Sequence, residues 1–371
     1  MSRYEFNLAS PEDDAALRLL LESTPMSGDI QLAFARQPSY FAATAIDGHY
    51  VQVVTARDKR AGRIVGMGSR SVFQAYVDGT PTDVGYLSGL RLLPEYRSRA
   101  GLVARGFRMF RELHADRRVA YYLTTIAADN HAALSVLTSQ RAGLPIYHPW
   151  GQYHTLTFAA RTGTAPTTTS GVSLRFATSD DADAIAKFLQ EQGPRRQFFP
   201  VLGEQEFAGH PPRLKGLDSK SILLAWTDRQ LVGTLGIWNQ SAFKQALVTA
   251  YSRRLSLVRP LYNAMAGLRG KPGLPPAGQP MNVRYAAVPV VRPDYSSVAS
   301  DLVRRAAASL RQSQADLLLL GLHERDPLLP QLRLLSGREY VTLMYLVYWP
   351  DETPDIDQLA TRVPYLELGC L

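Results

Sequence analysis

A turn rich in arginine offers the clearest binding chemistry in this sequence. Arg97 and Arg99 stand in a short polar stretch from Glu95 to Gly101. If a helix begins at this turn, its first backbone amides lack acceptors within the helix and face outward beside the two guanidinium groups. Such amides, together with the positive end of the helix dipole, attract anions. The turn therefore predicts a site for a polyanion such as a pyrophosphate.

An apolar strand and an amphipathic helix must hold this turn in place. The run from Tyr86 to Leu93 is mostly apolar and of strand length, and Pro94 ends it because proline has no amide hydrogen for a sheet ladder. Val103, Phe107 and Phe110 follow at helical spacing, so they form one apolar face of a helix. An ordinary strand, turn and helix with surface arginines would show the same pattern, and this alternative stays open.

These residues resemble the signature of the GNAT superfamily of acyl-CoA-dependent N-acyltransferases. Leu92, Leu93 and Pro94 stand for its Val-x-Pro-like step, and the stretch from Arg97 to Leu102 stands for its Arg/Gln-x-x-Gly-x-Gly/Ala loop. Ala100 and Leu102 replace the two glycines of that loop. The resemblance implies that acetyl-CoA or another acyl-CoA is the cosubstrate. The cofactor-binding residues that it implies are Leu90, Arg91, Leu92, Arg97, Ser98, Arg99, Ala100, Gly101, Leu102, Val103 and Asn130.

Asn130 is included because Asn130 and Ala133 resemble the Asn-x-x-Ala helix start of the family, although a plain helix cap explains an asparagine there equally well. The catalytic groups of the family are not in their usual places. Tyr86 stands where members often have a glutamate base, and Leu137 where they often have a tyrosine acid. The candidate catalytic residues are therefore Tyr86 and two nearby substitutes, Asp83 and Tyr147, with Tyr153 as an alternative to Tyr147. Each also has an ordinary structural explanation, because Asp83 follows a turn and tyrosines often lie half-buried in strands.

Four short motifs recur in the same order in the two halves of the chain. The stretch from Ala9 to Asp14 matches the one from Ala177 to Asp181, Ile64-Val65-Gly66 matches Leu231-Val232-Gly233, Pro94-Glu95-Tyr96 matches Pro293-Asp294-Tyr295, and Tyr153–Leu156 matches Tyr340–Leu343. The shared order favours tandem copies of one α/β domain. It is also the element order of the GNAT fold, so we expect an α/β (α+β) protein of two tandem GNAT-like domains. Each would have a mixed central sheet flanked by helices.

The expected domains are residues 1–160, which carry the acyl-CoA site, and residues 172–350. Residues 161–171 form a linker rich in Thr, Pro and Gly, and residues 351–371 form a tail whose apolar end should pack on a domain. The second copy contains an insertion at about 239–279, with a helix expected around 243–268.

The second copy departs from the signature at both of its cofactor-facing positions. Its turn from Tyr295 to Ser300 has neither arginine nor glycine, and the negatively charged Asp326 replaces the asparagine. We therefore expect it to have lost cofactor binding and to form a wall of the first domain's substrate site. Related domains often pair, so the two copies are expected to form an internal pseudo-dimer.

Charge and composition narrow the classes of partner. The net charge of +8 favours anionic partners, and arginines gather between Arg91 and Arg118. Because no basic run is interleaved with stacking aromatics, nucleic acid is an unlikely partner. No segment approaches the roughly 18 apolar residues of a membrane span, so we expect a soluble, cytoplasmic protein without a membrane partner. A single cysteine and histidines without ligand spacing predict neither a disulfide nor a metal site.

The sequence thus predicts an N-acyltransferase, in the simplest case an N-acetyltransferase, that acts on a small-molecule or peptide amine. Direct attack in a ternary complex is expected, because the only cysteine, Cys370, stands far from the signature in the sequence. The alternative is a non-catalytic acyl-CoA-binding or scaffold protein on the same fold, favoured by the missing glutamate and tyrosine. The acceptor, the acyl chain and the oligomeric state stay open.

Overall fold

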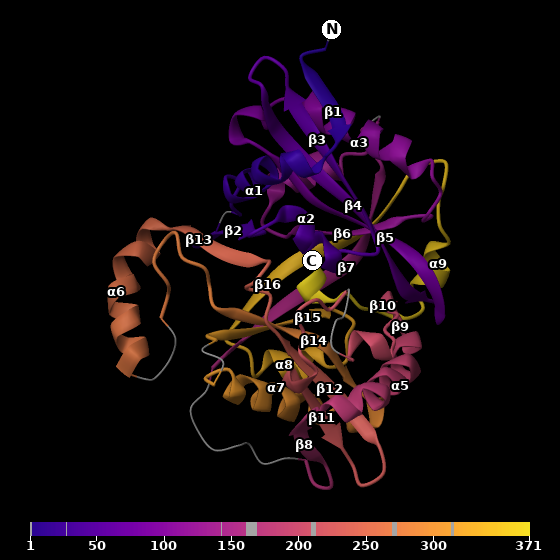
Figure 1. The fold of residues 1–371 in the computed structure, drawn as a ribbon, viewed down its shortest axis with the longest axis vertical. Helices are drawn as coiled ribbons and strands as arrows, with labels where there is room; N and C mark the ends of the chain where they lie inside the picture. The colour runs from indigo at the N-terminus through magenta and orange to yellow at the C-terminus, as the bar shows by residue number, and fades with distance from the viewer. Residues whose placement is uncertain are drawn as a thin grey trace.

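One continuous sheet runs through the molecule (Figure 1). The computed structural model describes residues 2–26, 28–141, 143–160, 169–208, 213–268, 273–312 and 315–371. Within these residues the sheet has thirteen strands in the order β1-β3-β4-β5-β6-β16-β7-β15-β14-β12-β11-β8, with β10 (Phe199–Pro200) paired to β4. The first half supplies β1 (Tyr4–Leu8), β3 (Tyr50–Asp58), β4 (Arg63–Val77), β5 (Thr80–Leu92), β6 (Tyr122–Ala127) and β7 (Ile146–Ala159). The second half supplies β8 (Ser173–Phe176), β11 (Ile222–Trp226), β12 (Leu231–Trp238), β14 (Val283–Val291), β15 (Leu317–His323) and β16 (Arg338–Tyr348).

The last strands of the two halves have exchanged places. β6 pairs with β16 of the second half, and β15 pairs with β7 of the first half. β7 and β16 also pair with each other, so the middle of the sheet alternates between the halves. Neither half therefore has a complete sheet without the other.

The exchange follows an approximate two-fold symmetry. Outward from the central pair, β6, β5, β4, β3 and β1 on one side correspond to β15, β14, β12, β11 and β8 on the other. His154 pairs with Val341, its own equivalent in the sequence repeat. On either side Tyr153 pairs with Thr342 and Thr155 with Tyr340, as in an isologous contact. The two copies of the sequence repeat are thus related by a pseudo-two-fold axis, as the register of β7 with β16 shows.

Helices cover both faces of each half. The helices of the first half are α1 (Asp14–Glu22), α2 (Tyr40–Ala43), α3 (Ala100–His114) and α4 (His131–Leu137). Those of the second half are α5 (Ala182–Gln192), α6 (Arg253–Leu268), α7 (Val298–Ser309), α8 (Leu329–Arg333) and α9 (Ile356–Leu359). Val53 packs with α1 and its neighbour Val54 packs with α3, so these helices lie on opposite faces of β3. In the second half Leu224 packs with α5 and its neighbour Leu223 packs with α7, so these two helices lie on opposite faces of β11.

The repeated helix starts have the local chemistry that the sequence predicts. Ser10 and Asp13 form a capping box ahead of α1, and Thr178 and Asp181 form the same box ahead of α5. The turn after β5 is a 3-10 turn at Pro94–Tyr96, and α3 begins at Ala100, as the apolar spacing predicts. The tail packs as expected, with Tyr365 and Leu366 buried and β17 (Val363–Pro364) paired to β9 (Arg196–Gln197).

The predicted helix over 243–268 is wrong in its first part. Gln245–Tyr251 form a strand, β13, which pairs antiparallel with β2 (Ile30–Ala35) of the first half, and only α6 is helical. Ala246 and Val248 are buried in this pairing. Backbone hydrogen bonds to the other half have thus overridden a local helix preference. Of the predicted linker 161–171, residues 161–168 lie outside the described residues.

Candidate active site

The strands β5 and β6 form a wedge. They run parallel but pair only at Gly85 with Tyr122 and at Tyr86 with Leu123. Beyond Tyr86, β5 continues to Leu92 along β4, whereas β6 pairs with β16. The two strands diverge there, and the backbone of β5 from Ser88 onward faces an opening rather than a neighbouring strand.

A bulge shapes the β5 side of the wedge. The register with β4 shifts between Met67, which pairs with Arg91, and Ser69, which pairs with Ser88, so β5 carries one extra residue. Gly89 has φ +62° within this segment, a left-handed conformation that favours glycine. The bulge changes the direction of the backbone at the predicted cofactor residues Leu90, Arg91 and Leu92.

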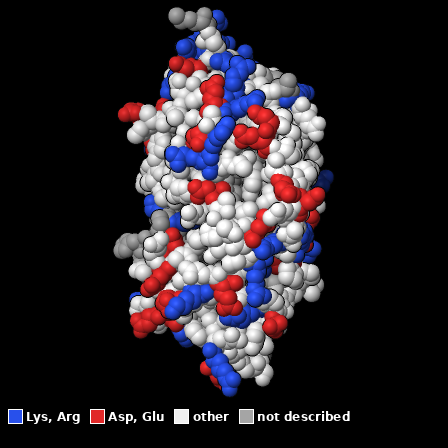
Figure 2. All heavy atoms as spheres, turned by 90° about the vertical axis from the view of Figure 1, so that its right-hand side faces the viewer, with Lys and Arg blue, Asp and Glu red and all other residues white. Residues whose placement is uncertain are grey.

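The predicted anion-binding turn lies at the end of β5. The amides of Arg97, Arg99 and Leu102 already donate to carbonyls within the turn. Among the described residues, the amides of Ser98 and Gly101 have no such acceptor, and Arg97, Ser98, Arg99 and Gly101 are all exposed. The turn thus offers two amides and two guanidinium groups to solvent. In Figure 2 basic and acidic side chains are interleaved on the visible face, without a field of a single sign.

An apolar pocket lies between α3 and the sheet beside the wedge. Leu90 and Leu92 line it from β5, and Leu102, Val103 and Phe107 line it from α3. Gly68 contributes space, since a Cβ there would lie 3.1 Å from the Phe110 ring. An apolar group could bind there next to the predicted cofactor residues.

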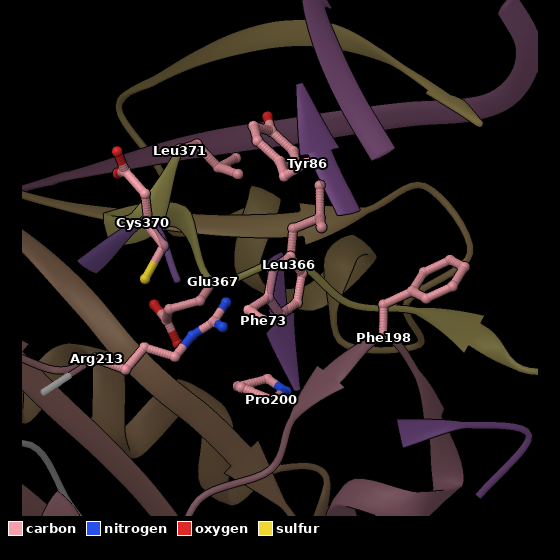
Figure 3. A pocket seen from close by; sticks show the side chains of 10 residues that line it. Phe73, Tyr86, Phe198, Pro200, Arg213, Leu366, Glu367, Cys370 and Leu371 are labelled. Carbon is pink, nitrogen blue, oxygen red and sulfur yellow. The ribbon is translucent and has the colours of Figure 1, made fainter. Parts of the chain in front are cut away.

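A second pocket, here called the central pocket, lies where the two halves and the tail meet (Figure 3). Its lining residues are Asp47, Phe73, Tyr86, Phe198, Pro200, Arg213, Leu366, Glu367, Cys370 and Leu371. Tyr86 lines the central pocket and also lies at the wedge, because it is the last β5 residue paired with β6. Its hydroxyl lies 2.9 Å from Thr125 Oγ1, just past the point of divergence. Burial raises the pKa of Tyr86 to about 12, so its hydroxyl stays protonated and is a hydrogen-bond donor.

Two carboxylates reach the central pocket, and their surroundings differ. Both oxygens of Asp47 accept hydrogen bonds from Arg36, at 2.8 and 3.0 Å. Glu367 Oε2 accepts from the Val288 amide at 2.9 Å and from the Tyr365 hydroxyl at 2.6 Å, whereas Oε1 is buried with no hydrogen-bond partner among the described residues. Burial raises the pKa of the Glu367 carboxyl. Glu367 therefore has a free acceptor oxygen and Asp47 does not.

Three more titratable side chains lie at or beside the central pocket, namely Arg213, Lys244 and Cys370. The Arg213 guanidinium lies over the Phe73 ring at 3.9 Å and points toward Glu367 in Figure 3, and its buried Nε has no partner among the described residues. Lys244 Nζ donates to the Gly369 carbonyl at 3.0 Å, and burial lowers its pKa to about 8. Burial raises the pKa of the Cys370 thiol to about 12, so it is a poor nucleophile at neutral pH.

The structure does not bring the three predicted catalytic residues together. Tyr86 lies at the wedge, but Asp83 lies near the start of β5, with one carboxylate oxygen 3.7 Å from His49 Nε2. Tyr147 belongs to a different core cluster, with Phe107 of α3, so it and Tyr86 lie on different faces of the sheet. Asn130 caps α4, its Oδ1 accepting from the Ala133 amide at 3.1 Å.

The second half has a matching wedge that the chain itself fills. β14 and β15 pair in parallel up to Tyr285 with Leu319 and then diverge, as β5 and β6 do after Tyr86. Val288, with φ +44°, stands at the position of Gly89. Its amide is bound by Glu367, and the 3-10 turn Leu368–Cys370 contacts both strands. The tail thus lies in the second opening.

Solved acyltransferase structures share this architecture. Saccharomyces cerevisiae N-myristoyltransferase with bound myristoyl-CoA matches with a TM-score of 0.60 at 12% identity, over 99% of this chain and 90% of that chain. A GCN5-related N-acetyltransferase from Sphaerobacter thermophilus matches with a TM-score of 0.56 at 14% identity, over 93% of this chain and 96% of that chain. The protein has a GNAT-like fold. The predicted fold class is therefore confirmed. No protein-family model matches the sequence, and no curated protein is significantly similar to it.

Within this GNAT-like fold, the tail contributes to the candidate site in a way that was not predicted from the sequence. Glu367 and Cys370 stand more than 250 residues from the signature turn, and only folding brings them beside Tyr86. Gly89 was a usable signal, because a glycine inside an apolar strand often marks a bulge. Among the described residues, no group of three or more His, Cys, Asp or Glu could hold a metal ion. None of the described helices is long and apolar enough to span a membrane.

Proposed function

We propose that the protein is an N-acyltransferase that transfers an acyl group from acyl-CoA to an amine by direct attack in a ternary complex. The observation that carries this proposal is the first wedge, which has a β-bulge, an arginine turn at its outer end and a pocket with a free carboxylate oxygen at its inner end. A strand opening of this kind offers backbone donors and acceptors to an extended ligand.

The residues along the wedge suit the parts of an acyl-CoA. The amides of Ser98 and Gly101, with Arg97 and Arg99, would hold the pyrophosphate. The backbone of Leu90, Arg91 and Leu92 would hold the pantetheine arm. An apolar acyl chain suits the pocket beside α3, and a solved structure of similar fold contains myristoyl-CoA. Acyl groups longer than acetyl are therefore candidates for transfer, as is acetyl itself.

In this proposal the central pocket supplies the proton chemistry. A carbon–nitrogen bond forms as the thioester carbon–sulfur bond breaks. One ammonium proton passes to Glu367 Oε1, and the second follows the departing sulfur to give the free thiol. The Tyr86 hydroxyl donates a hydrogen bond to that sulfur, since its raised pKa keeps it protonated. Cys370 takes no covalent part, because its raised pKa keeps it a thiol.

The pocket also suggests an acceptor class. Glu367 Oε1 is a free acceptor, and Arg213 Nε is a free donor beside it. An amine with a neighbouring carbonyl or carboxylate oxygen, as in an amino acid or a peptide amino terminus, would satisfy both groups.

The test is release of free thiol from acyl-CoAs of several chain lengths, measured against a panel of amines that includes amino acids and short peptides. We expect amine-dependent thiol release for at least one combination, and we expect α-amines to be preferred. Tight acyl-CoA binding with no turnover for any amine would instead support a non-catalytic acyl-CoA-binding or scaffold protein.

One acyl-CoA site per chain is a second expected result, because the tail fills the second wedge. Calorimetry with CoA should give one site, and Arg97→Glu with Arg99→Glu should weaken binding about tenfold or more, since each exposed charge contact contributes up to about 1 kcal/mol and reversal adds repulsion. The matched control is Arg229→Glu with Arg338→Glu, the same charge change at exposed positions of the second half. Two equivalent sites, or equal loss in the control, would contradict the assignment.

A further inference from the structure

Helix α6 carries an unusual concentration of exposed apolar side chains. Six of the eleven exposed large hydrophobic residues that the structure describes lie on this one helix. They are Leu257, Val258, Leu261, Tyr262, Met265 and Leu268, and Leu257 and Leu268 are 83% and 90% exposed. Their spacings of three and four residues place them along one side of the helix. The outer side of α6 is therefore a continuous apolar face.

The inner side of α6 is fixed to the protein. Asn263 exchanges two hydrogen bonds with the backbone of Leu274, at 2.8 and 3.0 Å. Arg259 lies over the Tyr251 ring at 5.3 Å, and Ala266 is buried. Through β13 the helix is tied to β2 of the first half, and in Figure 1 it projects from the side of the molecule. The apolar face is thus held outward on a supported element.

Every charged side chain in the chain segment that contains α6 is basic, and the nearest acid in the fold is Asp29, whose carbonyl accepts from the Ser252 amide ahead of the helix. No Asp or Glu occurs from Arg229 to Pro293, a stretch that contains the whole helix. Arg253 and Arg254 are exposed in its first turn. A helix that combines exposed leucines with arginines and lacks acids is typical of helices that lie in the headgroup region of anionic membranes.

We propose that α6 binds the surface of a membrane containing anionic lipid, with its apolar face in the headgroup and upper acyl region. The charge favours this partner over a second copy, because two copies would bring like-charged arginines together. The shape also favours it, since a protein partner must offer a matching groove to a protruding helix and a bilayer need not. A membrane partner was not expected from the sequence, and binding of α6 to a membrane does not depend on the proposed acyl transfer.

The experiment is flotation of the full-length protein with vesicles of phosphatidylcholine, alone or mixed with phosphatidylglycerol. We expect binding to the mixed vesicles, weakened by salt. Leu257→Glu with Leu261→Glu should lower the partition coefficient about tenfold for each leucine, because burial of one leucine contributes at least about 1.4 kcal/mol. Arg253→Gln with Arg254→Gln should lower it about fivefold for each arginine.

The matched control is Leu19→Glu with Leu334→Glu, the same change at leucines that are 65% and 87% exposed on α1 and beside α8. This variant should bind vesicles as the unaltered protein does, and thermal unfolding should show that every variant is folded. Three results would overturn the proposal: no binding to anionic vesicles at low salt, undiminished binding by the α6 leucine variant, or a solution dimer that the same variant dissociates.

Discussion

Either half of the chain expressed alone, residues 1–160 or 172–371, should be insoluble or aggregated. Without the second half, β6 loses its β16 partner, and β7 loses both β15 and β16. The unpaired strands carry the buried apolar side chains Leu123, Ile126, Leu156 and Phe158, and unpaired strand edges with apolar side chains aggregate. Co-expression of the halves should restore a soluble complex that binds acyl-CoA, because the exchange is held by noncovalent ladders. Soluble yield, light scattering and CoA calorimetry provide the measurements.

A protease site inserted within residues 161–168 of the full chain gives the control for this experiment. Cleavage after folding should leave the two halves together in gel filtration until a denaturant is added. A soluble, monomeric fragment 1–160 with full acyl-CoA binding and turnover would contradict the interdependence of the halves, as would separation of the cleaved halves in native buffer.

Replacement of Glu367 by glutamine should lower kcat by about 10²- to 10⁴-fold, the usual contribution of a positioned general base. The fold should survive, since a glutamine oxygen can still accept from the Val288 amide and the Tyr365 hydroxyl. Burial raises the pKa of Glu367, and the base must be deprotonated to act. Activity should therefore rise with pH through a pKa above the usual value of about 4.3 for glutamate, and this acid limb should disappear in the variant.

Asp316→Asn is the matched control, because burial also raises the pKa of this carboxyl but it does not line the central pocket. This variant should keep both kcat and the acid limb. If Glu367→Gln retains the rate and the limb of the unaltered protein, Glu367 only anchors the tail to Val288.

The sequence predicts the local features of this fold well, because their causes are local. The capping boxes at Ser10 and Thr178 follow from side chains within three residues of the helices that they start. Pro94 ends the signature strand region and Ala100 begins α3 for similarly local reasons. The repeat of Tyr153–Leu156 at Tyr340–Leu343 also showed that the halves are equivalent. It did not show that these two strands pair with each other, because a repeat says which segments are alike and not which ones meet.

The candidate site also has one part that the sequence predicts and one part that it does not. The arginine turn and Tyr86 belong to one contiguous signature, so they were found together. Glu367 lies in a tail that shares no motif with them, and its importance comes from a free oxygen in a pocket between the halves. The strand β13 was mistaken for helix because its partner, β2, lies about 200 residues earlier in the chain.

The exchange of β7 and β16 also affects synthesis of the protein on the ribosome. β6 emerges more than two hundred residues before β16, the strand that forms most of its ladder. At about 5–20 residues per second, the nascent first half waits about 10–40 s with that edge unpaired. A ribosome that stalls within this interval would hold a chain with an open apolar edge, so chaperone demand should begin as the first half emerges and last until β16 has been made.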